Sequence, residues 1–136
     1  MGKIIVRDSE SVDPTLFKGR MSRRVISPER DNSKKMSLHK VHRWAGLSNP
    51  TTYAENDEIL YILEGEGWIF EGEQKHHLTP GYCVLIPAGT TYQIFNPSDM
   101  KLLAILSPPR YRDEWGQRAD LVKLESPVDP PDSQKP

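Results

Sequence analysis

The sequence predicts an all-β protein whose strands form an antiparallel double-stranded β-helix, or jelly-roll barrel. The 136 residues contain many short β-rich runs, and turn residues separate these runs at regular spacing. Such spacing is typical of β-sandwiches and barrels. Hardly any window shows the apolar period of an amphipathic helix. A chain of this length forms one domain that buries a real core.

The predicted strands follow one another along the whole central part of the chain. They cover residues 3–6, 20–27, 35–44, 58–63, 67–70, 74–78, 82–86, 91–95 and 101–106. Proline and glycine end several of them, as at 87–89, because proline lacks a ladder donor and glycine tolerates a tight turn. Asp13-Pro14 begins a turn or a single helical turn, 27–33 is a polar hairpin loop, and 46–57 is loop leading into a strand.

The single domain divides into four predicted segments. Residues 1–34 supply N-terminal strands and a loop that cover the barrel, and 35–108 form the barrel core. Residues 109–125 form a C-terminal segment at the barrel, and 126–136 a disordered tail. The tail carries four prolines and Val128 as its one large hydrophobe. It therefore cannot bury enough apolar area to offset the entropy of ordering.

Composition excludes several classes of function. Lysine and arginine total 18, aspartate and glutamate total 19, and the net charge is −1. This balance gives no electrostatic footprint for nucleic acid or an anionic membrane. No apolar run approaches a membrane span, and the first residues lack the apolar core of a signal peptide. One cysteine, Cys83, excludes an intrachain disulfide framework, so we expect a cytoplasmic protein.

Two glycine-marked patterns carry the strongest functional signal. Residues 81–96, GYCVLIPAGTTYQIFN, have the spacing G-x5-P-x-G-x2-Tyr92-x3-N, and upstream Gly46, Glu58 and Gly65 are similarly spaced. These patterns resemble the two motifs of the cupin superfamily, the first of which is G-x5-H-x-H-x3-E-x6-G. The resemblance implies a jelly-roll barrel with a ligand site inside it.

The histidines of the family motifs are replaced in this chain. Depending on the spacer, their positions in the first motif hold Thr52 and Ala54, or Thr51 and Tyr53. Tyr92 stands at the histidine position of the second motif. Metal sites of this kind need three or four donors. We therefore expect no cofactor and disfavour a divalent metal; if one is present, its ligands are Glu58, Tyr92 and His39.

Glu58 and Tyr92 are the predicted catalytic residues. The motif match places Glu58 inside an apolar barrel, where loss of hydration raises the pKa of a carboxyl group and suits it to acid–base work. Tyr92 is expected to face it, and a phenol can donate to a developing oxyanion. The alternative is a structural pair in which each buried group satisfies the other.

Further polar residues are expected to orient a substrate. These are Tyr53, His39, Arg24, Arg43 and Thr52. Strand alternation places His39 and Arg43 on one face and His42 on the other. An arginine aimed into the barrel would bind a carboxylate or phosphate bidentately, although Arg20, Arg23 and Arg24 could equally form a solvated face. His76 and His77 are read as solvated, and Cys83 as a packing residue.

Within the superfamily, residues 36–67 are similar to the corresponding part of ectoine synthases. The shared residues are Ser37, His39, Gly46, Tyr53, Glu58, Tyr61 and Glu64 to Gly67. The resemblance implies that Glu58 matches one of that family's iron ligands, while Val84 replaces a tyrosine ligand and Tyr92 a histidine ligand. It implies a barrel that binds a small polar metabolite and does not support ectoine synthesis.

We therefore expect a cupin that binds a small, polar, anionic molecule and catalyses an isomerase-, lyase- or cyclase-type proton transfer. Two alternatives stay open at this point. One is a metalloenzyme with a degenerate glutamate, tyrosine and histidine site, and the other is a binding or sensing module without catalysis. The expected partners are the small-molecule ligand and a second copy of the chain, with no nucleic acid and no membrane.

Overall fold

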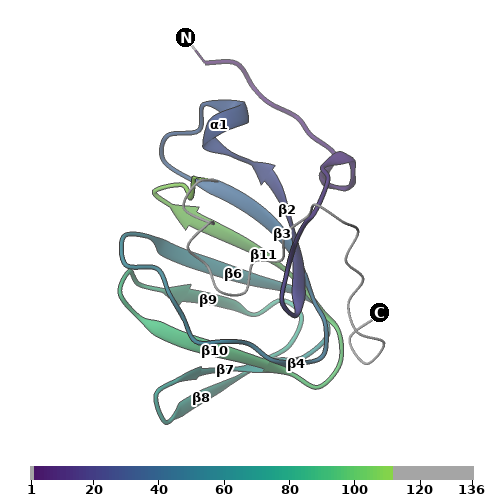
Figure 1. The fold of residues 1–136 in the computed structure, drawn as a ribbon, viewed down its shortest axis with the longest axis vertical. Helices are drawn as coiled ribbons and strands as arrows, with labels where there is room; N and C mark the ends of the chain where they lie inside the picture. Colours follow the sequence, from purple (N-terminus) through teal and green to yellow (C-terminus); the bar gives the residue numbers. More distant parts are fainter. Residues whose placement is uncertain (1, 112–136) are drawn as a thin grey trace.

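The computed structural model describes residues 2–111, which form two antiparallel β-sheets enclosing one core (Figure 1). The larger sheet has the order β1-β2-β3-β11-β6-β9, the smaller β4-β10-β7-β8, and β5 pairs with β10. The strands are β1 (Thr15–Phe17), β2 (Arg20–Ile26), β3 (Ser37–Arg43), β4 (Gly46–Leu47), β5 (Thr51–Thr52), β6 (Asp57–Glu64), β7 (Gly67–Glu71), β8 (Gln74–Leu78), β9 (Cys83–Ile86), β10 (Thr91–Asn96) and β11 (Met100–Ser107). This arrangement confirms the predicted all-β barrel.

Strict alternation along the strands builds the core. Every second residue of β3 and β11, and of β6 as far as Ile62, is buried, as the pleat of a half-buried strand requires. The two sheets contribute the buried cluster Val41, Leu60, Ile62, Ile69, Leu78, Ile86, Tyr92, Ile94, Met100, Leu102 and Ala104. Four of the residues at these buried positions, Ser37, His39, Arg43 and Glu58, are polar. The alternation that builds the core therefore also places polar side chains inside it.

The turn at Gly65 explains why the first motif ends on glycine. Gly65 has a φ of +82°, which L side chains rarely adopt, and a Cβ there would collide with the backbone carbonyl of Asp99. The turn connects β6 to β7 and so carries the chain from the larger sheet to the smaller one.

The N-terminal part differs from its prediction. Residues 3–6 form no strand, and Ile4 and Val6 are almost fully exposed, because no sheet edge lies against them. The helical turn comes earlier than Asp13-Pro14, as η1 (Ser9–Ser11). The polar loop after β2 contains a short helix, α1 (Pro28–Asp31), with Ser27 as its N-cap.

The N-terminal segment, predicted only to cover the barrel, also contributes a strand to the larger sheet. β2 pairs with β3 from Arg20↔Arg43 to Ile26↔Leu38 and is an integral strand of the larger sheet. The predicted C-terminal segment and tail, 109–136, lie outside the described residues from position 112 onward. No helix in the described part of the chain is long and apolar enough to cross a membrane.

Candidate active site

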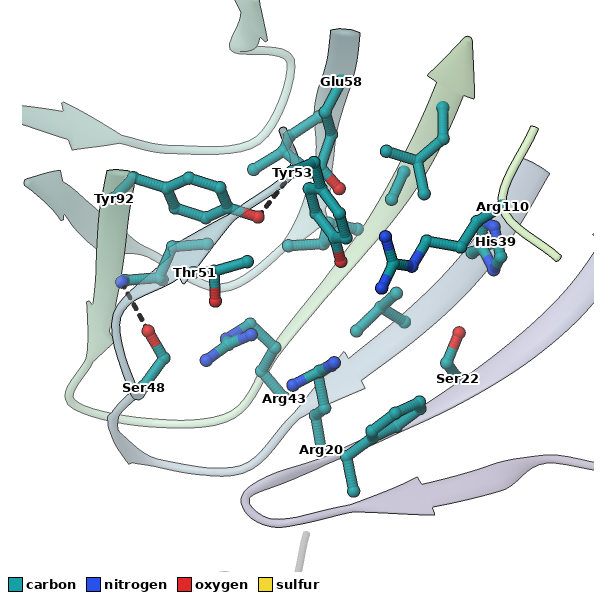
Figure 2. A pocket seen from close by; sticks show the side chains of 17 residues that line it. Arg20, Ser22, His39, Arg43, Ser48, Thr51, Tyr53, Glu58, Tyr92 and Arg110 are labelled. Carbon is teal, nitrogen blue, oxygen red and sulfur yellow. Dashed lines mark hydrogen bonds between the residues drawn. The ribbon is translucent and has the colours of Figure 1, made fainter. Parts of the chain in front are cut away.

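One cavity of about 60 Å³ lies inside the barrel and gathers most of the predicted site residues. Its lining comes from β1, β2, β3, β6, β10 and β11, and from the segment that carries β5 (Figure 2). The polar residues of the lining are Arg20, Ser22, His39, Arg43, Ser48, Thr51, Tyr53, Glu58, Tyr92 and Arg110. The remaining lining residues are apolar.

Glu58 and Tyr92 meet at one end of this cavity, as their motif positions predict. The Tyr92 hydroxyl donates a hydrogen bond of 2.5 Å to Oε1 of Glu58 (Figure 2). The two residues are only 3% and 8% exposed. β6 and β10 belong to different sheets, so the pair bridges the barrel interior.

The surroundings of Tyr92 keep its phenol neutral. Burial raises the pKa of Tyr92 well above its usual value, and the nearby Glu58 carboxylate raises it further, while Arg43 acts in the opposite direction. Tyr92 is therefore a proton donor or hydrogen-bond donor at any physiological pH. Because the Tyr92 hydroxyl is the donor of the hydrogen bond between the two residues, Glu58 is its acceptor.

The buried face of β3 supplies His39 and Arg43 to the same cavity. His39 Nε2 lies 3.1 Å from the hydroxyl of Ser37, and the Ser37 oxygen accepts a hydrogen bond of 3.2 Å from the backbone N–H of Arg110. His39 thus belongs to a polar network that holds the chain where it leaves β11. Arg43 is 9% exposed and points into the cavity (Figure 2).

Two predicted substrate residues do not line the cavity. Thr52 is exposed and its hydroxyl lies 2.6 Å from that of Thr91; the adjacent Thr51 lines the cavity instead, because neighbouring strand residues face opposite sides. Arg24 is buried but binds Glu29 and, at 3.1 Å, the carbonyl oxygen of Arg110. Arg24 therefore supports the cavity wall from behind.

Several lining residues were not singled out from the sequence as site residues. Arg20 and Ser22 share the alternating face of β2 with Arg24, and that period could have identified them. Arg110 follows Pro108-Pro109, and only the tertiary fold returns it to the cavity. No pattern in the sequence marks its position.

Other candidate groups lie outside the cavity. His76 and His77 are exposed as predicted, and His77 stacks on Trp68 with ring centroids 4.7 Å apart. His42 lies on the opposite face of β3 from His39 and bonds Asp99 at 3.0 Å. The interpretation of Cys83 as a packing residue was wrong: it is exposed, because Val84 and Ile86 take the inward positions of β9.

The residues present do not fit the metal that the family motifs imply. Among residues 2–111, no three of histidine, cysteine, aspartate and glutamate cluster as a metal site requires. Tyr92, the replacement for a histidine, keeps its proton and donates a hydrogen bond to Glu58. Val84, at another ligand position, is an aliphatic residue packed against the core. Metal-free chemistry therefore stays our prediction.

Comparison with known proteins agrees with the fold and the motifs. A cupin domain matches residues 40–106. L-ectoine synthase of Saccharopolyspora erythraea is 28% identical over 113 residues, covering 78% of this chain and 82% of that protein. The crystal structure of ectoine synthase from P. lautus superposes with a TM-score of 0.77 at 25% identity, covering 93% and 94% of the two chains.

A further solved structure shares the fold alone. KdgF from Halomonas sp. superposes with a TM-score of 0.67 at 19% identity, covering 79% of this chain and 96% of that one. The sheet topology, the domain match and the two ectoine synthases lead to one conclusion. The chain is a small protein of the cupin superfamily that resembles ectoine synthase.

Proposed function

We propose that this cupin is an enzyme of the isomerase, lyase or cyclase type that transfers protons on a small anionic metabolite. One observation carries the proposal: a carboxylate and a neutral phenol, both buried, meet inside a cavity that arginines also line. Paired groups of this kind in a cleft are candidates for acid–base catalysis. The similarity to two ectoine synthases supports an enzymatic role.

In the proposed reaction Glu58, Tyr92 and Arg43 each have one role. Glu58 removes a proton from a carbon or nitrogen of the substrate, and the electron pair of that bond moves into the substrate toward an electronegative atom. Tyr92 turns its O–H from Glu58 to that atom and donates a hydrogen bond or the proton itself. Arg43, which interacts electrostatically with Tyr92, stabilises the negative charge that develops.

Glu58→Gln tests the base. Glutamine keeps the volume and the hydrogen-bonding ability, so folding should be nearly intact while turnover falls by about 10²–10⁴-fold, the usual worth of a positioned acid or base. Deuterium incorporation from D₂O into a panel of small carboxylic acids, read by mass spectrometry, measures proton abstraction before the product is known. Tyr92→Phe should also lower the rate of deuterium incorporation, by a smaller factor than Glu58→Gln.

The matched control is Glu64→Gln on the same strand. Glu64 is exposed and pairs loosely with Lys101 at 3.5 Å, so its replacement should leave exchange unchanged. Thermal melts of all variants accompany the assay. Full exchange activity in Glu58→Gln would end the catalytic interpretation.

A binding module without catalysis is the second candidate. The Glu58–Tyr92 hydrogen bond is the observation that favours a binding module. Each of the two buried groups already has the other as its hydrogen-bond partner, as in a pair with a structural role only. In that case both variants lose thermal stability, and no compound exchanges deuterium in the wild-type protein. Elemental analysis after dialysis against chelator tests the metalloenzyme alternative, for which one iron, zinc, nickel or manganese per chain is required.

A further inference from the structure

The hydroxyl group of Ser37 lies out of solvent between two groups of the site. Ser37 begins β3 and is 0% exposed. Its Oγ lies 3.2 Å from the backbone nitrogen of Arg110 and 3.1 Å from Nε2 of His39, a residue that lines the cavity. A buried hydroxyl needs a partner for its proton as well as for its oxygen. These two contacts therefore determine where the protons of this network lie.

The contact with Arg110 fixes the direction of the first hydrogen bond. A backbone N–H can only donate, so the Ser37 oxygen is the acceptor. The segment that carries this N–H is held by two further contacts. The side chain of Asn56 donates to the carbonyl of Pro108 at 2.6 Å. Arg24 donates to the carbonyl of Arg110 at 3.1 Å, so the N–H of Arg110 is a donor held in place on Ser37.

The second contact then receives the proton of Ser37. Within residues 2–111, the structure gives this hydroxyl no hydrogen-bond acceptor other than Nε2 of His39. If the imidazole donated to Ser37 instead, Oγ would accept two hydrogen bonds and its own proton would be buried without an acceptor, which is costly. With Ser37 as the donor, the N–H of Arg110, the hydroxyl and Nε2 are all satisfied, and each bond of such a chain strengthens the next.

We infer that Ser37 holds His39 as the neutral imidazole with its proton on Nδ1, so that His39 serves the site as a hydrogen-bond donor and not as a base. In this tautomer the lone pair of Nε2 accepts from Ser37 and Nδ1 carries the proton. Neither nitrogen then has a lone pair with which to remove a proton from a substrate. Ser37 is thus a positioning residue that acts through His39. The inference rests on the proposed function in one respect, since it leaves Glu58 as the base of the proposed reaction.

Nitrogen-15 NMR of the imidazole rings tests the tautomer in the full chain without any substrate. Spectra that correlate the ring nitrogens with the carbon-bound ring protons distinguish the two neutral tautomers and the imidazolium. The chain has four histidines, and His39→Asn identifies the signals of His39 by their absence. At pH 8, above the usual histidine pKa of about 6.5, we expect the Nδ1–H form to predominate. Predominance of the Nε2–H form, an even mixture or an imidazolium would overturn the inference.

Ser37→Ala tests whether Ser37 sets the tautomer. Without the hydroxyl, Nε2 loses its donor, so the signals of His39 should move toward the Nε2–H form. Ser37→Thr keeps a hydroxyl on Cβ and should keep the Nδ1–H form. Unchanged signals in Ser37→Ala would overturn the positioning role.

The matched control is Ser107→Ala. Ser107 is exposed, and its hydroxyl donates at 2.7 Å to the carbonyl of Lys35, so its loss should leave the signals of His39 unchanged. Thermal melts show whether each variant is folded. If Ser37→Ala does not fold, the wild-type spectrum decides the tautomer, and a change of tautomer in folded Ser37→Thr would count against the role of the hydroxyl.

Deuterium exchange separates this inference from the proposed function. The amide of His39→Asn can donate in place of Nδ1 but cannot act as a base, so exchange should stay within about tenfold of wild type. Glu58→Gln should lose about 10²–10⁴-fold, and an equal loss in His39→Asn would overturn the donor role. The Nδ1–H form without exchange in the wild-type protein would support the inference on Ser37 and end the catalytic proposal. The Nε2–H form with exchange would do the reverse.

Discussion

Tyr92 shows how a single residue can be prepared for chemistry by its position. It stands where the family motif has a metal-binding histidine, yet its hydroxyl donates to Glu58 and its ring packs in the core cluster. Burial and the adjacent carboxylate together keep it protonated. The replacement therefore changes the available chemistry from metal ligation to proton or hydrogen-bond donation.

The raised pKa of Tyr92 predicts a particular pH dependence of stability. An unfolded tyrosine titrates at about 10, and the folded residue above it. The stabilisation of the neutral form is thus fully present below about pH 10 and is lost as the pH rises through the folded pKa. Above pH 10, the melting temperature of wild type should fall more steeply than that of Tyr92→Phe.

The control for this prediction is Tyr82→Phe, which alters an exposed phenol on the loop before β9. Thermal melts from pH 8 to 11 on the three proteins give the comparison. Parallel curves for wild type and Tyr92→Phe would show that the phenol is not held neutral by the fold.

At the scale of elements, one ion pair fastens the N-terminal segment to α1. Arg7 donates two hydrogen bonds of 2.8 Å to the two carboxylate oxygens of Asp31 and one of 2.7 Å to the carbonyl of Val25. Asp31 also accepts from the backbone N–H of Ser27, the residue that caps α1. The same carboxylate therefore orders the helical turn and the strand-free segment before η1.

Asp31→Asn should weaken the interaction between Arg7 and α1. The hydrogen bonds from Arg7 lower the pKa of Asp31, so its contribution to stability is present above the unfolded pKa of about 3.9 and is lost as the pH falls through the folded value. At pH 7 we expect a melting temperature lower by a few degrees and faster proteolysis within residues 2–12.

Asp13→Asn, which changes an exposed carboxylate just after residues 2–12 in the sequence, should melt as wild type. At a pH below the folded pKa of Asp31, wild type and Asp31→Asn should converge. A constant difference between them across that range would show that charge is not the source of the effect.

At the scale of the whole molecule, the outer face of the larger sheet carries a row of apolar side chains. Leu38, Ile105, Ile59 and Leu85 are register partners across β3, β11, β6 and β9, and Ile59 and Leu85 are 37% and 65% exposed. Tyr61 extends this outer apolar row on β6. A contiguous apolar strip rimmed by polar residues marks a contact surface, and a two-fold axis pairs such a strip with itself.

We therefore keep the prediction of a homodimer and assign this row to its interface. Leu85→Lys should shift the protein from dimer to monomer, because a buried unpaired charge on each copy opposes association. Light scattering coupled to size-exclusion chromatography measures the mass. Leu47→Lys, at an equally exposed leucine on the smaller sheet, should remain dimeric. A monomeric wild type at high concentration would refute the assignment.

Much of the fold and part of the site follow from local order in the sequence. The alternation of β3 predicted that His39 and Arg43 share one face, because strand geometry sends every second side chain to the same side. The motif match predicted that Glu58 lies inside the barrel. Glycines and prolines marked the turns for equally local reasons. Tyr92 followed from motif spacing, which places β10 opposite β6.

The tertiary structure alone decided the rest. Whether Thr51 or Thr52 faces the cavity depends on pairing with β10, which spacing leaves open by one residue. Cys83 is exposed because the register of β9 on β6 pairs it with Tyr61 on the outer face of the larger sheet. Arg110 reaches the site because Ser37, seventy-three positions earlier, binds its backbone. Local sequence sets the alternation of side chains along a strand. Contacts between distant segments set which of the two faces is inside and which residues meet there.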